Sequence, residues 1–411
     1  MSERVPEGWR ISKLEDHLYR PLAYGVLKPD SFVDDGVPML RIQDVSISGL
    51  NRRKLHRISE KLHQEFKRTQ LKEGDLVISL VGTIGRVLEI PKSLDGANVS
   101  RAFGVIGLSD DINRDYIKQF LTSQKTQDWI QEQAQGNAQK VLNLGGLRNL
   151  SIVSPPLPEQ KKIASILTSV DEVIETTQKQ IDKLQDLKKA TMNELLTKGI
   201  GHTEFKDSEL GRIPMSWETK RLDEVSIISR GKFSHRPRND PNFYNGNYPY
   251  LQTGDIPTDV TDITLFTQTL NDKGLKVSKL FPKDTLVLTI AATIGEVGVL
   301  TFDSCFPDSL VGINCIKNKM SPYFLLYTLR SAKQNLIAEA PESAQKNLNL
   351  DILNPFSIKM PSLTEQRKIE TILLSIDDNL KEKTQKLIQI QSLKKSLMQD
   401  LLTGKVRVQV H

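Results

Sequence analysis

The chain of 411 residues has little cysteine and no long apolar run, and both absences narrow its class. Two cysteines, Cys305 and Cys315, do not suggest a disulfide scaffold, which favours a reducing cytoplasm. No stretch approaches the roughly 18 apolar residues of a membrane span, and residues 1–6 lack the apolar segment of a signal peptide. We therefore expect a cytoplasmic protein without a membrane partner.

The sequence also lacks the common catalytic motifs. Gly231-Lys232 and Gly404-Lys405 have neither the upstream glycine nor the following hydroxyl of a phosphate-binding loop, and no G-x-G-x-x-G turn is present. The six histidines are scattered, and no histidine or cysteine spacing indicates zinc. We expect no catalytic residue, no metal and no cofactor on this chain.

Two partial matches keep a catalytic alternative open. Ser154-Pro155-Pro156 is similar to the loop of DNA amino-methyltransferases, but Leu157 replaces the aromatic residue that would stack on the flipped base. Pro29-Asp30 with Glu65-Phe66-Lys67 can be aligned to a nuclease pattern, although the second triplet lies in a polar run. We interpret both as coincidental, and a stand-alone methyltransferase or nuclease is the alternative.

The net charge of +6 and the pI of about 9.0 suit a polyanionic partner such as nucleic acid. An ordinary basic protein would have the same values, so charge alone does not decide between the two.

What the chain does contain is an internal repeat. AQKVLNL at 138–144 returns as AQKNLNL at 344–350, an offset of 206, and more than half of the positions in 138–172 match their partners. Residues 20–36 and 228–247, by contrast, have little in common. The pattern predicts a duplicated scaffold that carries two different sets of surface loops.

Each copy begins with about 150 residues of short apolar runs broken by turn residues, typical of strands. Thr-Ile-Gly ends such a run in both copies, and we expect Gly85 and Gly295 to adopt positive φ. Residues 116–129 and 323–336 have helical periodicity. The predicted class of this part is therefore mixed α+β.

Each copy ends in a long amphipathic segment. Apolar residues recur at three-to-four spacing from Ile163 to Leu195 and from Ile369 to Leu401, as in a coiled-coil seam. We expect the two helices to pair as an antiparallel coiled coil; the alternative is two amphipathic helices that each lie on their own globule. The predicted organisation is a first domain at 1–157, helix 158–197, linker 198–213, second domain 214–363, helix 364–403 and tail 404–411.

The order of these features resembles the specificity subunits of type I restriction–modification systems. The shared motifs are the Pro-x-x-Trp starts at Pro6–Trp9 and Pro214–Trp217, and the helix starts PPLPEQKKI at 155–163 and PSLTEQRKI at 361–369. The resemblance covers nearly the whole chain. Ala291-Ala292 replaces the more usual Val-Gly before Thr-Ile-Gly, which is a small departure.

The resemblance implies two target recognition domains that each contact one half of a split, asymmetric site in double-stranded DNA. It implies that the helices act as spacer and that two modification subunits, with S-adenosylmethionine, dock on this chain. Restriction subunits that use ATP and Mg²⁺ would join them, and this chain would be non-catalytic. A coiled-coil scaffold that binds no nucleic acid is a further alternative.

Candidate DNA contacts are the basic and amide side chains of the divergent loops, because Arg and Lys pair with guanine, and Asn and Gln with adenine. In the first domain they are Arg20, Lys28, Arg41, Gln43, Arg52, Arg53 and Lys54. In the second they are Arg230, Lys232, His235, Arg236, Arg238, Asn239, Tyr244, Asn245 and Asn247. Gln139-Lys140 and Gln345-Lys346 recur in both copies, which indicates phosphate contact or structure rather than base reading.

Overall fold

The computed structural model describes residues 5–46, 49–50, 55–134, 140–258, 260–291, 293–339 and 347–410. The chain forms two compact units. Unit 1 comprises residues 1–178 and 385–411, and unit 2 comprises residues 179–384. Each unit therefore combines a globular part with one segment of each long helix, whereas the sequence assigned the helices to separate domains.

The globular part of unit 1 is built from short strands and helices. Its strands are β1 (Arg10–Lys13), β2 (Val37–Leu40), β3 (Val45–Ser46), β4 (Gly49–Leu50), β5 (His56–Ile58), β6 (Leu76–Ser79), β7 (Val87–Glu89), β8 (Asn98–Val99), β9 (Phe103–Ile106) and β10 (Ser151–Ser154). Its α-helices are α1 (Glu60–Glu65), α2 (Arg114–Thr122), α3 (Gln124–Gln133) and α4 (Leu144–Arg148). The strands form the sheets β7-β6-β9 and β5-β2-β8 and the pairs β1-β10 and β3-β4.

Unit 2 repeats this plan with longer strands. Its strands are β11 (Phe205–Lys206), β12 (Ile213–Pro214), β13 (Glu218–Arg221), β14 (Ser226–Arg230), β15 (Tyr244–Tyr250), β16 (Asp262–Ile263), β17 (Gln268–Leu270), β18 (Leu280–Phe281), β19 (Leu286–Thr289), β20 (Val297–Leu300), β21 (Ser304–Cys305), β22 (Leu310–Cys315) and β23 (Ser357–Met360). Its short α-helices are α6 (Leu222–Val225), α7 (Asp272–Lys276), α8 (Pro322–Ser331), α9 (Lys333–Glu339) and α10 (Leu350–Leu353). The main sheets are β14-β22-β19-β20-β16 and β17-β15-β21-β18, with the pairs β13-β23 and β11-β12. The predicted mixed α+β class is confirmed.

The central strand of each unit, β6 or β19, is buried along its length and leads into the shared Thr-Ile-Gly turn. Gly85 and Gly295 adopt φ of 85° and 87°, which confirms the predicted turns. In both units the glycine N–H donates back to the last residue of the strand, Ser79 or Thr289. The duplicated sequence thus makes the same turn twice.

The helical segments predicted at 116–129 and 323–336 are each broken into two helices. In unit 1, Ser123 ends α2 and caps α3, because its hydroxyl accepts the N–H of Thr126 at 3.4 Å. In unit 2, α8 ends before Ala332 and α9 begins at Lys333.

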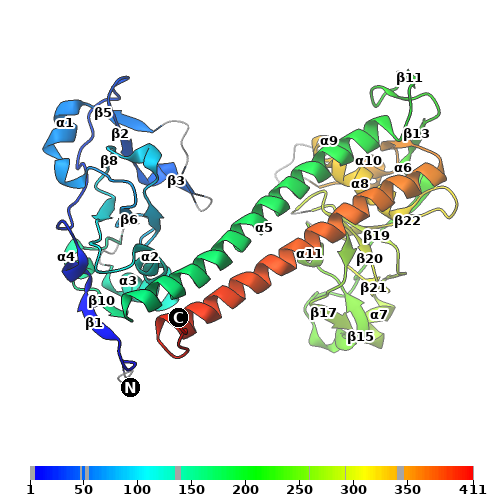
Figure 1. Cartoon of the computed structure of the whole chain (residues 1–411). Helices are drawn as coiled ribbons and strands as arrows, with labels where there is room; N and C mark the ends of the chain where they lie inside the picture. Colours follow the sequence, from blue (N-terminus) through cyan, green and yellow to red (C-terminus); the bar gives the residue numbers. More distant parts are fainter. Residues whose placement is uncertain are drawn as a thin grey trace. The chain divides into compact units, whose positions relative to one another are not determined.

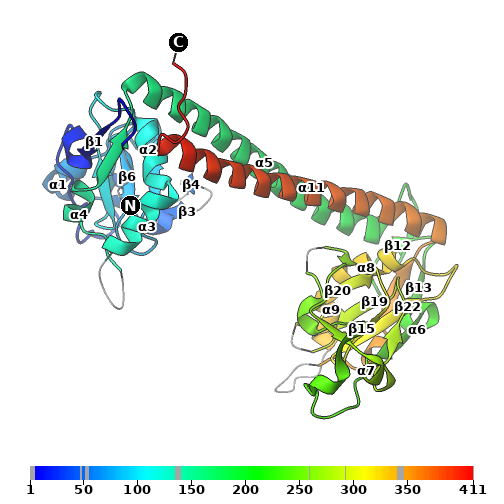
Figure 2. The ribbon, with the colours of Figure 1, turned by 90° about the horizontal axis from the view of Figure 1, so that it is seen from below.

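The long helices are α5 (Leu157–Lys198) and α11 (Leu363–Leu402), and a segment of one lies antiparallel beside a segment of the other within each unit (Figures 1 and 2). In unit 1, Lys394 Nζ lies 2.6 Å from Asp171 Oδ1. In unit 2, Lys188 Nζ lies 2.5 Å from Asp377 Oδ1. The two ion pairs are equivalent, because both residues in each are related by the offset of 206. Among the described residues, no helix is both long and apolar enough to cross a membrane.

The predicted linker and tail are parts of the units. Residues Phe205–Lys206 pair with Ile213–Pro214 as strands β11 and β12, so 198–213 is not an unstructured connection. After α11, Arg407 makes two hydrogen bonds to Glu159, at 2.7 and 2.8 Å, and a third to the carbonyl of Glu7. Short polar segments can therefore complete a unit although their composition is typical of linkers.

Candidate nucleic-acid interface

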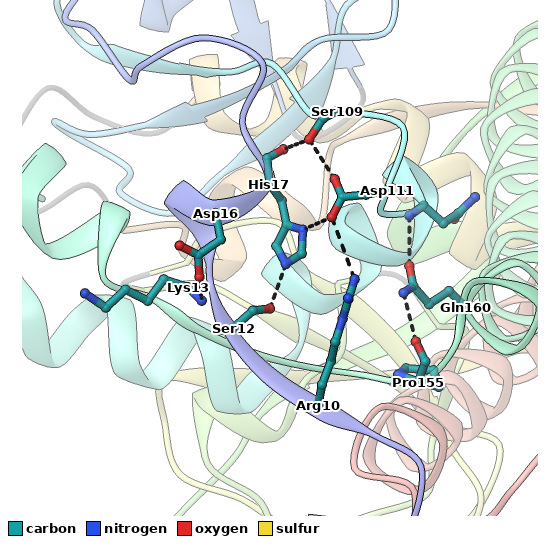
Figure 3. A network of polar contacts seen from close by, with 10 residues as sticks. Arg10, Ser12, Lys13, Asp16, His17, Ser109, Asp111, Pro155 and Gln160 are labelled. Atoms are coloured by element: carbon teal, nitrogen blue, oxygen red, sulfur yellow. Dashed lines mark hydrogen bonds and ion pairs between the residues drawn. The ribbon is translucent and has the colours of Figure 1, made fainter.

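In each unit, a buried glutamine at the start of the long helix holds the globular part from which the loops project. We call this shared support the frame. In unit 1, Gln160 Oε1 accepts the N–H of Asn113 at 2.8 Å, and its Nε2 donates to the carbonyl of Pro155 at 2.9 Å (Figure 3). In unit 2, Gln366 Oε1 accepts the N–H of Ser321 at 2.9 Å, and its Nε2 donates to Pro361 at 3.0 Å. The same amide thus connects the helix to the globular part in both units.

The neighbouring glutamates are used differently. Glu365 accepts hydrogen bonds from the N–H of Ile200 at 2.9 Å, from His202 at 2.8 Å and from Trp217 Nε1 at 3.0 Å. Glu159, its counterpart in unit 1, is instead paired with Arg407. The indole nitrogen of Trp9 is buried without a hydrogen-bond partner among the described residues. The glutamate joins the end of one long helix to the start of the other in each unit.

Unit 1 has a polar network that unit 2 does not share. Buried His17 lies with Nε2 2.6 Å from Ser12 Oγ and Nδ1 2.5 Å from Asp111 Oδ2, and Ser109 also bonds Asp111 (Figure 3). Burial tends to raise the pKa of Asp111, but the hydrogen bonds from Ser109 and His17 outweigh it and lower the pKa below its ordinary value. Although the residue types match a Ser–His–Asp triad, Ser12 is held in the β1–β10 ladder, and we interpret the network as structural.

The basic loop of unit 2, which lies within the divergent residues 228–247, is anchored by aromatic packing. Phe233 is buried, and its ring lies 5.5 Å from Tyr250, 5.7 Å from Tyr244 and 6.2 Å from Phe243. Burial raises the pKa of both Tyr250 and Tyr244, so their hydroxyls stay protonated. The loop is therefore fixed at its base and can present the residues around Phe233 outward.

Several predicted contacts of unit 2 have partners within the unit. Arg238 Nη2 lies 2.7 and 2.9 Å from the two oxygens of Asp308, and His235 lies 3.1 Å from Asp240. Arg236 donates to the carbonyls of Phe233 and His235 at 2.6 and 2.8 Å, while Arg230 reaches Leu348 at 3.4 Å and Tyr244 bonds the Arg238 carbonyl. The exposed predicted residues of this loop are Lys232, Arg236, Arg238, Asn239, Asn245 and Asn247.

The predicted residues of unit 1 also divide into paired and exposed groups. Arg20 is largely buried and bonds Asp75 and the carbonyl of Gln70, which makes it a structural ion pair. Arg41 is half-buried, with Nε and Nη2 each 3.2 Å from Asp44. Lys28, Gln43 and Lys140 are exposed. Arg52, Arg53, Lys54, Gln139, Gln345 and Lys346 lie outside the described residues.

A cavity of about 470 Å³ opens beside the basic loop of unit 2. It is lined by residues Arg238, Asn239, Pro241, Tyr244, Asn245, Tyr250, Gln252, Gln268 and Pro307. Gln252 and Gln268 were not predicted from the sequence. Gln252 nevertheless corresponds to Arg41, which was, and aligning the buried leucines Leu40 and Leu251 would have found it. In the described part of the chain, no three His, Cys, Asp or Glu side chains are grouped as a metal site would need.

The sequence matches one protein family twice. The family model described as the type I restriction modification DNA specificity domain matches residues 27–186 and 214–392. The chain belongs to this family. Members are specificity subunits, which are non-catalytic, and the chemistry of type I restriction–modification systems lies in other subunits of the complex.

Individual type I specificity subunits are similar over most of the chain. A protein named as the MjaX specificity subunit of a type I restriction enzyme, from Methanocaldococcus jannaschii, is 29% identical and covers 98% of this chain and 95% of its own length. The MjaVIII specificity subunit from the same organism is 32% identical over 70% of each chain. The crystal structure of the S subunit from M. genitalium has a TM-score of 0.60 at 15% identity, over 97% of both chains, and so shares the fold.

Proposed function

We propose that this specificity subunit reads a bipartite, asymmetric DNA site, with each unit contacting one half. The observation that carries the proposal is one frame with two different loop surfaces. Gln160 and Gln366 support both globular parts by the same hydrogen bonds, whereas residues 20–36 and 228–247 differ. A protein that reads two different DNA sequences with one scaffold needs a common frame and two different loop surfaces.

The remaining activities belong to partners under this proposal. Two modification subunits dock on the chain and bind S-adenosylmethionine, and restriction subunits bind ATP and Mg²⁺, all acting in the cytoplasm. The repeat supports two equivalent docking positions, because the helix starts at 155–163 and 361–369 are similar and each unit has an equivalent Lys–Asp pair.

Exchange of the globular part of unit 2 tests the proposal directly. Residues 214–360 would be replaced by the matching domain of a related specificity subunit, and the methylated motif read by sequencing modified bases in cells that carry all the subunits. We expect one half-site to change and the other to stay, because Glu365 and Gln366, which hold the globular part, lie outside 214–360 and are kept. A change in both half-sites, or in neither, would refute separable reading.

The same proposal makes the helices a spacer. Four residues inserted after Leu184 and four after Ile390 add one turn, about 6 Å, to each helix. At about 3.4 Å per base pair, the gap between half-sites should grow by one or two base pairs. An active variant with the original gap would assign the spacing to the partner subunits.

A scaffold without DNA binding is separated from the proposed function by a binding titration. Phosphate contacts release counterions, so affinity for duplex DNA must fall steeply as salt is raised. Replacing exposed Lys232 and Arg236 with alanine should weaken binding and flatten that dependence, while the melting temperature stays unchanged. Absence of binding at low salt would favour the scaffold.

A further inference from the structure

Residues Arg41 and Gln252 occupy the same place in the two units. Arg41 precedes the short 3-10 helix η2 (Ile42–Asp44), and Gln252 precedes η7 (Thr253–Asp255). In both, the backbone N–H of this residue donates to the final aspartate, at 2.9 Å to Asp44 and at 2.7 Å to Asp255. The backbone frame is therefore conserved between the units while the side chain changes from arginine to glutamine.

The side chain of Gln252 is part of an amide pair at the cavity of unit 2. Its Nε2 donates to Gln268 Oε1 at 2.9 Å, from the neighbouring strand β17. This bond leaves Gln252 Oε1 as an acceptor and both N–H groups of Gln268 as donors. An acceptor beside a donor is complementary to the N6 and N7 edge of adenine, whereas guanine presents two acceptors there.

The walls of the cavity suit an uncharged, planar, polar group. The rings of Tyr244 and Tyr250 line it with centroids 6.0 Å apart, and Asn239 and Asn245 add further amides. The Arg238 side chain is engaged by Asp308, so its charge is partly neutralised inside the unit. These contacts favour a nucleobase over a phosphate group.

The chain bends sharply at this cavity. Asn245 has a positive φ of 62°, a conformation that asparagine adopts more readily than most residues, and the register of β15 against β17 shifts between Tyr244 and Tyr248. Asn271 fixes the bend by donating to the carbonyls of Asn242 and Tyr244, both at 3.0 Å. A bulge of this kind re-aims side chains at the edge of a sheet.

In unit 1 the equivalent position carries different chemistry. Arg41 is oriented by two hydrogen bonds to Asp44, which leave further N–H groups of the guanidinium as donors. The residue equivalent to Gln268 is His56, because it pairs with Met39 as Gln268 pairs with Tyr250. Oriented arginine donors match the two acceptors of guanine.

We propose that positions 41 and 252 are equivalent base-reading positions, Gln252 with Gln268 contacting an adenine in the half-site of unit 2 and Arg41 contacting a guanine in that of unit 1. This inference rests on the proposed function that each unit reads one half-site. To that function the inference adds which residues contact DNA bases and which bases they contact.

The test is a change of base preference. The full chain with Gln252→Arg, expressed with its partner subunits, should methylate a motif in which one adenine of the unit-2 half-site has become guanine. Arg41→Gln should make the reciprocal change in the other half-site. Gln334→Ala, which alters an exposed glutamine of α9 in the same unit, is the matched control and should leave the motif unchanged. An active Gln252→Arg variant with the original motif, or a natural unit-2 half-site without adenine, would overturn the inference.

A binding measurement decides the matter if the variant is inactive. Duplexes would carry purine, which lacks N6, or 7-deazaadenine, which lacks N7, in place of each adenine of the half-site. Both analogues should weaken binding by the wild-type complex at one position, by about 5-fold to 150-fold, and have no effect on a Gln252→Ala/Gln268→Ala complex. Equal sensitivity of the two complexes would overturn the inference and leave the domain-exchange result, and with it the proposed function, untouched.

Discussion

Units 1 and 2 agree at the start of the long helices and differ where the loops project. Gln160 and Gln366 share two hydrogen bonds, and the glycines of the Thr-Ile-Gly turns have nearly equal positive φ. On the loop surface, Arg41 in one unit corresponds to Gln252 in the other. The comparison separates the residues that maintain the common scaffold from the loop residues that, under the proposed function, specify bases and therefore differ.

Removal of the buried glutamines should have the largest effect on stability. Gln160→Ala or Gln366→Ala leaves the N–H of a helix cap and a proline carbonyl buried without a partner, which should cost about 2–3 kcal/mol of unfolding free energy. The two amides share two bonds, so both losses should be substantial and each should be confined to its own unit. The loss at Gln366 should be the larger, because its Nε2 also donates to the carbonyl of Lys319 at 3.0 Å. Hydrogen exchange resolved by peptide would measure this, and a large effect in one unit only would break the equivalence.

Substitution of the glutamates should destabilise the two units by different amounts. Glu365→Ala removes the partner of buried Trp217 Nε1 and of His202, so unit 2 should lose about 2 kcal/mol. Glu159→Ala should cost unit 1 less, because it frees the half-exposed side chain of Arg407 to solvent. Urea unfolding of the two variants, with Glu365→Gln as the conservative control, would compare them; equal losses would show that the glutamates are interchangeable.

The helix–helix ion pairs should contribute less. Lys188→Asp should destabilise unit 2 by about 1 kcal/mol, since Asp377 then faces a like charge while still bonded to Tyr327. The exchanged pair Lys188→Asp/Asp377→Lys should recover part of the loss. The same exchange at Lys394 and Asp171 should have a smaller effect, because Asp171 is more exposed. Thermal melting of the single and exchanged variants would show the recovery. No recovery in either unit would mean that the ion pairs do not stabilise the helix pairing.

The smallest expected effect is the pH dependence that Asp111 contributes to unit 1. The pKa of Asp111 is lowered in the folded state, so its contribution is present at neutral pH and is lost as pH falls below its ordinary value of 3.8. Asp111→Asn should reduce stability at pH 7 by at most about 1 kcal/mol, given its exposed side chain, and the difference from wild type should shrink toward pH 3. Unit 2 has Val225 and Lys319 at the equivalent positions and should not show this dependence. A constant difference across pH would assign the effect to packing.

Much of the fold could be predicted from the sequence because the sequence contains an internal repeat. The offset of 206 revealed the two copies, and the apolar period predicted helices that run within a few residues of α5 and α11. The break at Ser123 was missed because residues 116–129 were interpreted as one helix from their apolar spacing, although serine is a favoured N-cap. Strands β11 and β12 within the predicted linker were not foreseen, because two residues each are too few for a periodic signal.

The candidate site was less predictable. Charge drew attention to Arg20 and Arg238, but the sequence does not show that Asp75 and Asp308, far away along the chain, engage them. Gln252 and Gln268 are uncharged and sixteen residues apart, and they meet only because β15 and β17 are neighbours. Which loop side chains come together depends on strand register. The amino-acid composition of a divergent loop does not predict that register.

The central claim is that the two units read two half-sites, and the methylated motif of cells carrying this chain with its partner subunits tests it most directly. Sequencing of modified bases should return a bipartite, asymmetric motif with a fixed unread gap, which disappears when this chain is deleted. A continuous or palindromic motif, or one that survives the deletion, would contradict the account.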